Sequence, residues 1–277
     1  MRRIVAILAI AALALCYAPT IRGTVHQWWT DEDMGYAFLV PVVIAWIVWR
    51  DRDRLRKLPV RGSGWGFTLL ALAASLQVAS VLGAGLFAGS LAFVLSLAGV
   101  LLCLLGWAWL RALAFPLILT LFMLPKLAVV YNQVTLPLQL LATRLAGGML
   151  AAVGFMVVRD GNILNVAGHS IAVVEACDGI RYLLPLGFLA LVFAYTAGAR
   201  PWLRVGMLAA AIPTAIVANA MRVAFSGLSP TLTSGVPHEL LGTLIFVLCL
   251  GLLAGIYRLF RFVPDGTRSR PRLSPHR

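Results

Sequence analysis

Three polar side chains that lie far apart in the sequence have the chemistry of a cysteine-nucleophile site: Cys177, Arg222 and His238. Cys177 stands in the charged stretch Val173–Arg181, whereas the other three cysteines lie in apolar segments without a charged neighbour. A guanidinium near a thiol, here Arg181 four residues on, favours the thiolate, which is the nucleophilic form of cysteine.

Each of these residues also has a purely structural interpretation. Cysteine packs as a small apolar side chain, and an arginine at a helix end extends its charge to the membrane surface. A histidine in a loop needs no function at all. The catalytic interpretation therefore depends on whether the three residues meet on one face of the membrane.

If they meet, acyl transfer is the reaction they support. His238 takes the proton of Cys177 and later gives it to the leaving amine. Arg222 stabilises the oxyanion of the tetrahedral intermediate, because its charge acts strongly in a site of low dielectric.

Further residues have supporting roles in this interpretation. Arg181 holds the thiolate or positions the substrate backbone, and Asn219 lies one helical turn before Arg222 on the same face. Glu175 and Asp178 are structural or contact the substrate. His169 is a rival base, nearer to Cys177 in the sequence but ranked below His238 because it sits on a turn of the predicted β-hairpin.

Composition places the chain among polytopic membrane proteins. It has 277 residues, of which 61% are hydrophobic and only 12% charged, and its mean hydropathy is +0.93. The net charge of +13 is spread over short blocks between apolar runs, without the basic and aromatic stripe of a nucleic-acid-binding protein. The cysteines form no CxxC pair and no cluster with histidine, so we expect no disulfide framework, metal site or cofactor.

The apolar runs predict an all-α bundle of about eight transmembrane helices, at 4–18, 35–49, 65–82, 86–105, 112–127, 180–198, 205–225 and 240–257. A glycine-rich turn at 83–85 separates the third from the fourth. Residues 131–158 are expected to form an amphipathic segment on the outer membrane surface. Residues 157–176 predict a small β-hairpin leading into Cys177. We expect one membrane domain over 1–262 and a basic, disordered cytoplasmic tail over 263–277.

The positive-inside rule orients this bundle. With eight spans, most of the 23 Lys and Arg residues fall on the side of the N- and C-termini, which is therefore cytoplasmic. Cys177, Arg222 and His238 then lie near the outer ends of the sixth, seventh and eighth spans, so the topology predicts that all three share one face.

At this point the motifs resemble those of a known family. Ala176–Arg181 resembles the signature Ala-Cys-Ser-Gly-Ile-Arg of the exosortase/archaeosortase family, Asn219–Val223 resembles its second motif, and His238 with Gly242 resembles its third. Phe38–Pro41 with Trp49-Arg50, and Leu136–Gln139, also resemble family segments. Two departures stand out: Asp178 replaces the usual serine and opposes thiolate formation, and Tyr36-Ala37 replaces a common His-Gly.

The resemblance implies a cysteine transpeptidase of the bacterial inner membrane, with both termini cytoplasmic and a periplasmic site of Cys177, Arg222 and His238. Its partners would be membrane lipids and exported proteins with a C-terminal sorting signal: a Pro-Glu-Pro type motif, one transmembrane helix and a basic tail. The enzyme would form a thioester on Cys177 and pass the substrate to an acceptor, in connection with exopolysaccharide production. No nucleic acid is involved, and the oligomeric state is open.

Two alternatives of another class remain. In a membrane transporter, Arg181, Arg222 and His238 would line a polar path, which predicts polar residues at mid-membrane depth in several spans. In a non-catalytic assembly factor for polysaccharide export, the same residues would only brace the outer face. Substituting Cys177 separates an enzyme from both alternatives.

Overall fold

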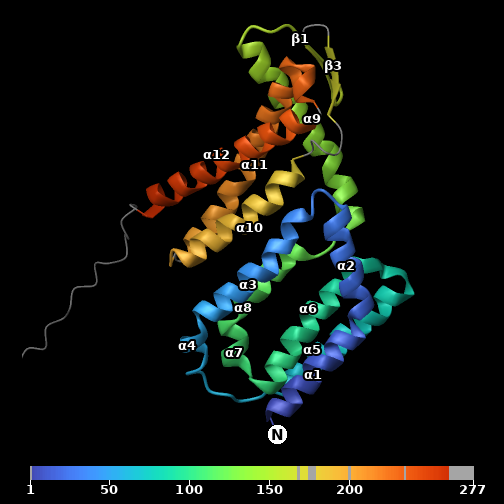
Figure 1. Cartoon of the computed structure of the whole chain (residues 1–277), viewed down its shortest axis with the longest axis vertical. Helices are drawn as coiled ribbons and strands as arrows, with labels where there is room; N and C mark the ends of the chain where they lie inside the picture. The colour runs from blue at the N-terminus through green and yellow to red at the C-terminus, as the bar shows by residue number, and fades with distance from the viewer. Residues whose placement is uncertain (1, 167–168, 174–178, 199–200, 234, 262–277) are drawn as a thin grey trace, which may run out of the picture. The chain divides into compact units, whose positions relative to one another are not determined.

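The computed structural model describes residues 2–166, 169–173, 179–198, 201–233 and 235–261. Helices make up 81% of it and one small sheet interrupts them, so the predicted class of a mostly helical membrane protein is confirmed. The chain forms two compact units, Met1–Leu136 and Pro137–Arg277 (Figure 1), and their boundary falls within helix α9 (Ala128–Ala152). The predicted tail, 263–277, lies outside the described residues.

The first unit is helical throughout. In chain order it contains α1 (Arg2–Cys16), α2 (Ala18–Thr30), η1 (Gly35–Phe38), α3 (Leu39–Arg50), α4 (Arg52–Leu55), α5 (Trp65–Ala79), η2 (Ser80–Ala84), α6 (Gly85–Leu104), α7 (Trp107–Ala112), α8 (Ala114–Leu119), η3 (Thr120–Met123) and the start of α9.

Helices α5 and α6 form an antiparallel hairpin, side by side in Figure 1. The chain reverses at Gly83 and Gly85, whose φ angles of +124° and +81° are readily adopted only by glycine. A Cβ on Gly66 of α5 would lie 2.6 Å from the carbonyl oxygen of Gly99 of α6, so small residues allow the close approach. The predicted turn at 83–85 is thereby confirmed.

Helix α2 was not predicted. It follows α1 at a bend of 65° and has proline in its first turn, where the missing N–H costs no hydrogen bond. Two hydroxyl pairs tie this part of the chain to α6: Tyr17 to Ser96 and Thr24 to Ser90, both at 2.8 Å. Such hydrogen bonds stabilise helix contacts where no water competes.

A partly buried ion cluster joins the loop after α2 to the start of α9. The Nζ of Lys126 donates to Asp31 Oδ1 at 2.8 Å and to Asp33 Oδ2 at 2.6 Å. The hydroxyl of Tyr131 donates to the same oxygen of Asp33 at 2.8 Å. The Lys126 side chain is 15% exposed, so solvent screens this cluster far less than a surface ion pair.

We expect Lys126→Met to lower the free energy of unfolding by about 2–4 kcal/mol, because it leaves two neighbouring carboxylates without their cation. Burial lowers the pKa of Lys126, but its hydrogen bonds to Asp31 and Asp33 raise it more, so the net shift is upward. The charge of Lys126 therefore contributes fully below the unfolded lysine pKa of about 10.4 while both carboxylates are ionised, and this contribution is lost as the pH rises through the folded pKa.

Reversible unfolding in mixed micelles measures this effect. Arg56→Met is the matched control, because Arg56 pairs with Asp53 at 3.9 Å on an exposed surface, where an ion pair contributes about 0–1 kcal/mol. Equal losses in the two variants would contradict a stabilising role for the buried cluster.

The second unit combines helices with the sheet. It contains the rest of α9, β1 (Val157–Asp160), β2 (Ile163–Val166), β3 (His169–Ala172), α10 (Ile180–Thr196), α11 (Pro201–Leu228), η5 (Pro230–Leu232) and α12 (Gly235–Arg261).

The sheet has the antiparallel order β1-β2-β3. Asp160 pairs with Ile163 across a two-residue turn in which Gly161 has a φ of +58°. Leu164 and Val166 of β2 are buried against α9 and α11. The sequence predicted a hairpin here; the structure extends it by a third strand, because 169–172 continues the ladder on β2.

Residues 131–158 were predicted to form an amphipathic surface segment. The structure has one helix, α9, over Ala128–Ala152, and it continues through Pro137. By length and composition this helix could cross a membrane. Its location on or across the membrane therefore stays a prediction.

Each of the eight predicted spans coincides with a helical segment, but their crossing is not established. Among the described residues, four helical segments are long and apolar enough to cross a membrane: Trp65–Leu104, Ala128–Ala152, Trp202–Leu228 and Gly235–Phe260. The bent pair α1–α2 makes a fifth if it counts as one span. Gly35–Arg50, Ala114–Met123 and Ile180–Thr196 are shorter apolar helices.

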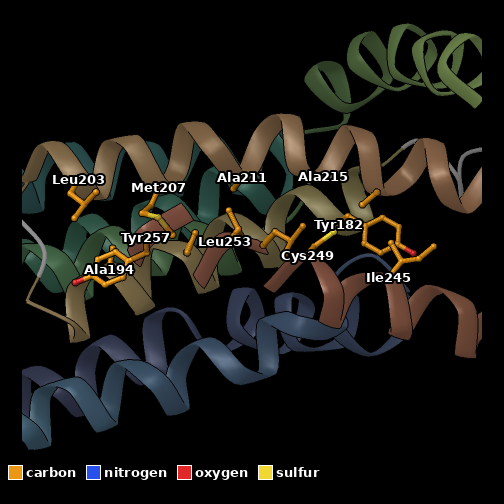
Figure 2. Close-up of a cluster of buried hydrophobic side chains, with 13 residues drawn as sticks. Tyr182, Ala194, Leu203, Met207, Ala211, Ala215, Ile245, Cys249, Leu253 and Tyr257 are labelled. Carbon is orange, nitrogen blue, oxygen red and sulfur yellow. The ribbon is translucent and has the colours of Figure 1, made fainter. Parts of the chain in front are cut away.

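Helices α10, α11 and α12 pack around one apolar cluster (Figure 2). Its members include Leu186 from α10, Met207 and Ala211 from α11, and Leu253 from α12. Small residues predominate on α11, so the helices approach closely. This three-helix core fixes the positions of the polar side chains described next.

Candidate active site

The buried Arg222 and the partly buried His238 form a pair between α11 and α12. The Nη2 of Arg222 lies 2.7 Å from the Nε2 of His238, and Arg222 is only 2% exposed. A charged side chain inside an apolar helix faces a partner in the interior rather than lipid, because lipid leaves its charge unsolvated. The predicted meeting of these two residues is thus observed.

The partners of His238 assign its proton. Its Nδ1 lies 2.7 Å from the carbonyl oxygen of Leu232, which only accepts, so Nδ1 carries the hydrogen. Arginine only donates, so Nε2 offers its lone pair to Arg222. His238 is therefore a neutral imidazole with its basic nitrogen against the guanidinium.

A second residue of α11 supports the same ring. The hydroxyl of Ser226 donates to the carbonyl oxygen of Leu232 at 3.0 Å, and Ser226 lies one helical turn beyond Arg222. Two residues of α11, four positions apart, thus hold His238. Arg222 contacts Nε2 directly, and Ser226 acts on Nδ1 through the Leu232 carbonyl.

The guanidinium of Arg222 has two further neighbours. Its Cζ lies 5.6 Å from the ring centroid of Tyr182, and a Cβ on Gly242 would lie 3.4 Å from its Cζ and Nε. Among the residues that the structure describes, the buried Nε has no hydrogen-bond partner. A buried donor of this kind favours an incoming oxygen acceptor.

The start of α10 packs on the helix that carries Arg222. Gly179, with a φ of +89°, precedes the first turn of α10, and a Cβ there would lie 3.3 Å from Asn219. Asn219 is itself buried, three residues before Arg222. Gly179 is two residues after Cys177 in the sequence, so the predicted nucleophile adjoins a residue in contact with this helix.

The same stretch of chain is anchored on its other side. The backbone N–H of Val173 donates to the carbonyl oxygen of Asn162 at 2.8 Å, and the side-chain amide of Asn162 donates to the Val173 carbonyl at 3.0 Å. Val173 is buried beneath the sheet. Val173 and Gly179, the described residues on either side of 174–178, are therefore both held in place.

The other predicted residues are placed as follows. Arg181 is half-buried in the first turn of α10, and His169 begins β3, paired with Val166. Glu175, Cys177 and Asp178 lie outside the described residues. Among the described residues no group of three or more His, Cys, Asp or Glu side chains could hold a metal ion.

Sequence reasoning missed three contributors: Tyr182, Ser226 and the carbonyl group of Leu232. Ser226 carried a signal, because its spacing of four residues from Arg222 places both on one helix face. Tyr182 directly follows Arg181 but reads as an ordinary core aromatic. The role of a backbone carbonyl cannot be predicted from the sequence, because every residue has one.

The arrangement combines a neutral base with a buried cation beside it. The base can accept a proton only when the guanidinium leaves Nε2, and the guanidinium can stabilise developing negative charge on an oxygen. This combination suits reactions in which an oxyanion forms as a proton is transferred.

A comparison with protein families gives a match over this whole region. The family model described as Transmembrane exosortase (Exosortase_EpsH) matches residues 28–255, which is most of the chain and includes Cys177, Arg222 and His238. No curated protein and no solved structure matches the chain.

Proposed function

The chain belongs to the transmembrane exosortase family, and from this premise we propose that it is a cysteine transpeptidase acting on exported proteins that carry a C-terminal sorting signal. The signal would consist of a short Pro-Glu-Pro type motif, a transmembrane helix and a basic tail. The single observation that supports this site most is the partly buried hydrogen bond between Arg222 and His238, 2.7 Å long.

In the proposed reaction, the sulfur of Cys177 attacks the scissile carbonyl carbon and its proton passes to Nε2 of His238. Because Nε2 accepts a hydrogen bond from Arg222 in the resting site, the guanidinium moves to the carbonyl oxygen as that oxygen gains charge. The N–H of Arg222 Nε, which has no partner among the described residues, is a second donor for the same oxygen.

Collapse of this intermediate breaks the C–N bond. His238 gives its proton to the leaving amine, and the substrate remains as a thioester on Cys177. An acceptor nucleophile then attacks the thioester carbonyl, loses its proton to His238, and releases the Cys177 thiolate. Water as acceptor gives hydrolysis, and an amine or a glycan hydroxyl gives transfer.

The packing of Gly179 on Asn219 supports a role for Cys177 in this site. Gly179 contacts Asn219 on the helix that carries Arg222 and stands two positions after Cys177 in the sequence, and two residues of extended chain span at most about 7 Å. The link to surface protein and exopolysaccharide export belongs to the same proposal.

The topology is proposed with it. Eight crossings, with both termini in the cytoplasm of a bacterial inner membrane, place the start of α10, the end of α11 and the start of α12 on the periplasmic side. The helices at all eight predicted positions support this count.

A reporter tests the function. It joins an exported domain to a Pro-Glu-Pro motif, a transmembrane helix and an arginine cluster, and it is co-expressed with the protein in a bacterial host. We expect a shortened reporter with the wild type and none with Cys177→Ala, and a hydroxylamine-sensitive adduct of the reporter with the wild type alone. Equal processing by Cys177→Ala, or no processing by the wild type, would overturn the proposal.

A further inference from the structure

Tyr182 lies where the three helices of the second unit meet the Arg222–His238 pair. It belongs to α10, is 4% exposed, and forms one end of the apolar cluster in Figure 2. Its hydroxyl donates to the carbonyl oxygen of Gly242 on α12 at 3.4 Å. The ring is therefore fixed between α10 and α12, independently of Arg222.

The ring of Tyr182 attracts the guanidinium. The Cζ of Arg222 lies over it, 5.6 Å from the centroid, which is within the range of a cation–π contact. Both side chains are almost fully removed from solvent, and such contacts are strongest when desolvated. Helix α10 thus contributes a contact to a cation carried by α11.

Because Gly242 has no side chain, the guanidinium of Arg222 and the hydroxyl of Tyr182 can both lie close to its backbone. A Cβ at this position would lie 3.4 Å from Cζ and Nε of Arg222 and 3.1 Å from the hydroxyl oxygen of Tyr182. The first distance is an ordinary van der Waals contact and the second is tighter than most, so a side chain there would press chiefly on Tyr182. His238, one turn earlier on α12, holds the Nη2 end of the same guanidinium.

From these contacts we propose that Tyr182 is a positioning residue, which holds the Arg222 guanidinium where it can pass from His238 to the oxyanion. This inference rests on the function proposed above. A cation that has lost its ring contact can still attract substrate but meets the oxyanion poorly. The loss should therefore appear in kcat and spare KM.

Three variants test the proposal with the purified reporter in detergent. Tyr182→Leu removes the ring, and we expect kcat to fall by about tenfold to thirtyfold with KM within about twofold. Tyr182→Phe keeps the ring and should stay within about threefold of the wild type.

Tyr257→Leu is the matched control. Tyr257 lies at the other end of the same cluster in Figure 2, is 5% exposed, and donates its hydroxyl to the carbonyl of Ala197 at 3.2 Å. It should remain within about threefold of wild-type kcat. Equal losses in Tyr182→Leu and Tyr257→Leu, or a Tyr182→Phe enzyme as slow as Tyr182→Leu, would overturn the proposal.

An unfolding measurement tests the contact between Tyr182 and Arg222 without depending on the proposed reaction. If the wild type cleaves no reporter, the proposed function fails, and the contact is still tested by a double-mutant cycle of Tyr182→Leu with Arg222→Met on the unfolding equilibrium. We expect the double variant to depart from additivity by about threefold or more in the equilibrium constant. Additive effects would overturn the proposed contact.

Discussion

Replacing His238 by glutamine should lower the rate of sorting-signal cleavage by about 10²–10⁴-fold while the protein stays folded. A glutamine amide can donate to the Leu232 carbonyl and accept from Arg222, the two hydrogen bonds that the imidazole makes in the structure. What it cannot do is take up the proton of a thiol. The variant therefore separates proton transfer from the structural role of the ring.

The comparison is with His169→Gln, which changes the rival base at the start of β3. We expect this variant to cleave the reporter at nearly the wild-type rate. Retained cleavage by His238→Gln together with loss in His169→Gln would assign the base to His169. The thermal unfolding midpoint of each purified variant reports whether it is folded.

Replacing Arg222 by lysine should lower the same rate by about 10²–10³-fold, although the charge is kept. Lysine is a point charge on a flexible stem, whereas the planar guanidinium offers separate donors to His238 and to an oxyanion. In the structure Nη2 is bound to His238, and Nε has no partner among the described residues. The single ammonium group of lysine cannot donate from two such separate positions.

Arg204→Lys is the matched control for this substitution. Arg204 lies on the same helix with its Cζ 4.8 Å from the ring centroid of Tyr195, so the exchange alters a similar contact away from His238. We expect it to leave kcat unchanged within about twofold. An Arg222→Lys enzyme as active as Arg204→Lys would show that Arg222 contributes charge alone.

The helical framework was predictable because apolar runs reveal where helices form. The runs also revealed the turn at 83–85, since glycine there has backbone angles that other residues avoid. The bend between α1 and α2 did carry a signal in the sequence, because Pro19 directly follows Ala18 and a proline at this position ends one helix and begins the next. The third strand was missed because its pairing with β2 depends on register and not on composition.

Within the candidate site, the pairing of Arg222 with His238 followed from topology: two polar residues near the same end of neighbouring spans have few other partners in an apolar bundle. The roles of the Leu232 carbonyl and Tyr182 did not follow. Backbone acceptors are the same at every position, and an aromatic residue in a helix core reads as packing.

The ion cluster of the first unit was hidden for a different reason. Lys126 is more than ninety positions from Asp31 and Asp33 in the chain. Lys126 falls at the end of the predicted span 112–127 and the two aspartates in the loop before the second predicted span, and formal charge says nothing about which of these segments meet. Only the folded chain selects this pair of carboxylates from the ten acidic residues of the sequence.

In the proposed reaction the acyl group is carried by Cys177, which lies in the sequence between Val173 and Gly179, two residues that are both held in place. Enzymes that move a covalently bound group between distant centres do so on long, flexible carriers. Here the fixed backbone at Val173 and the contact of Gly179 with Asn219 leave only five residues between them. For the proposed thioester this favours formation and release at one location, so the departing peptide would have to leave the position that the acceptor then uses. Both acyl transfers of the proposed reaction would then use the same position, and slow release of the cleaved membrane helix would limit the turnover rate.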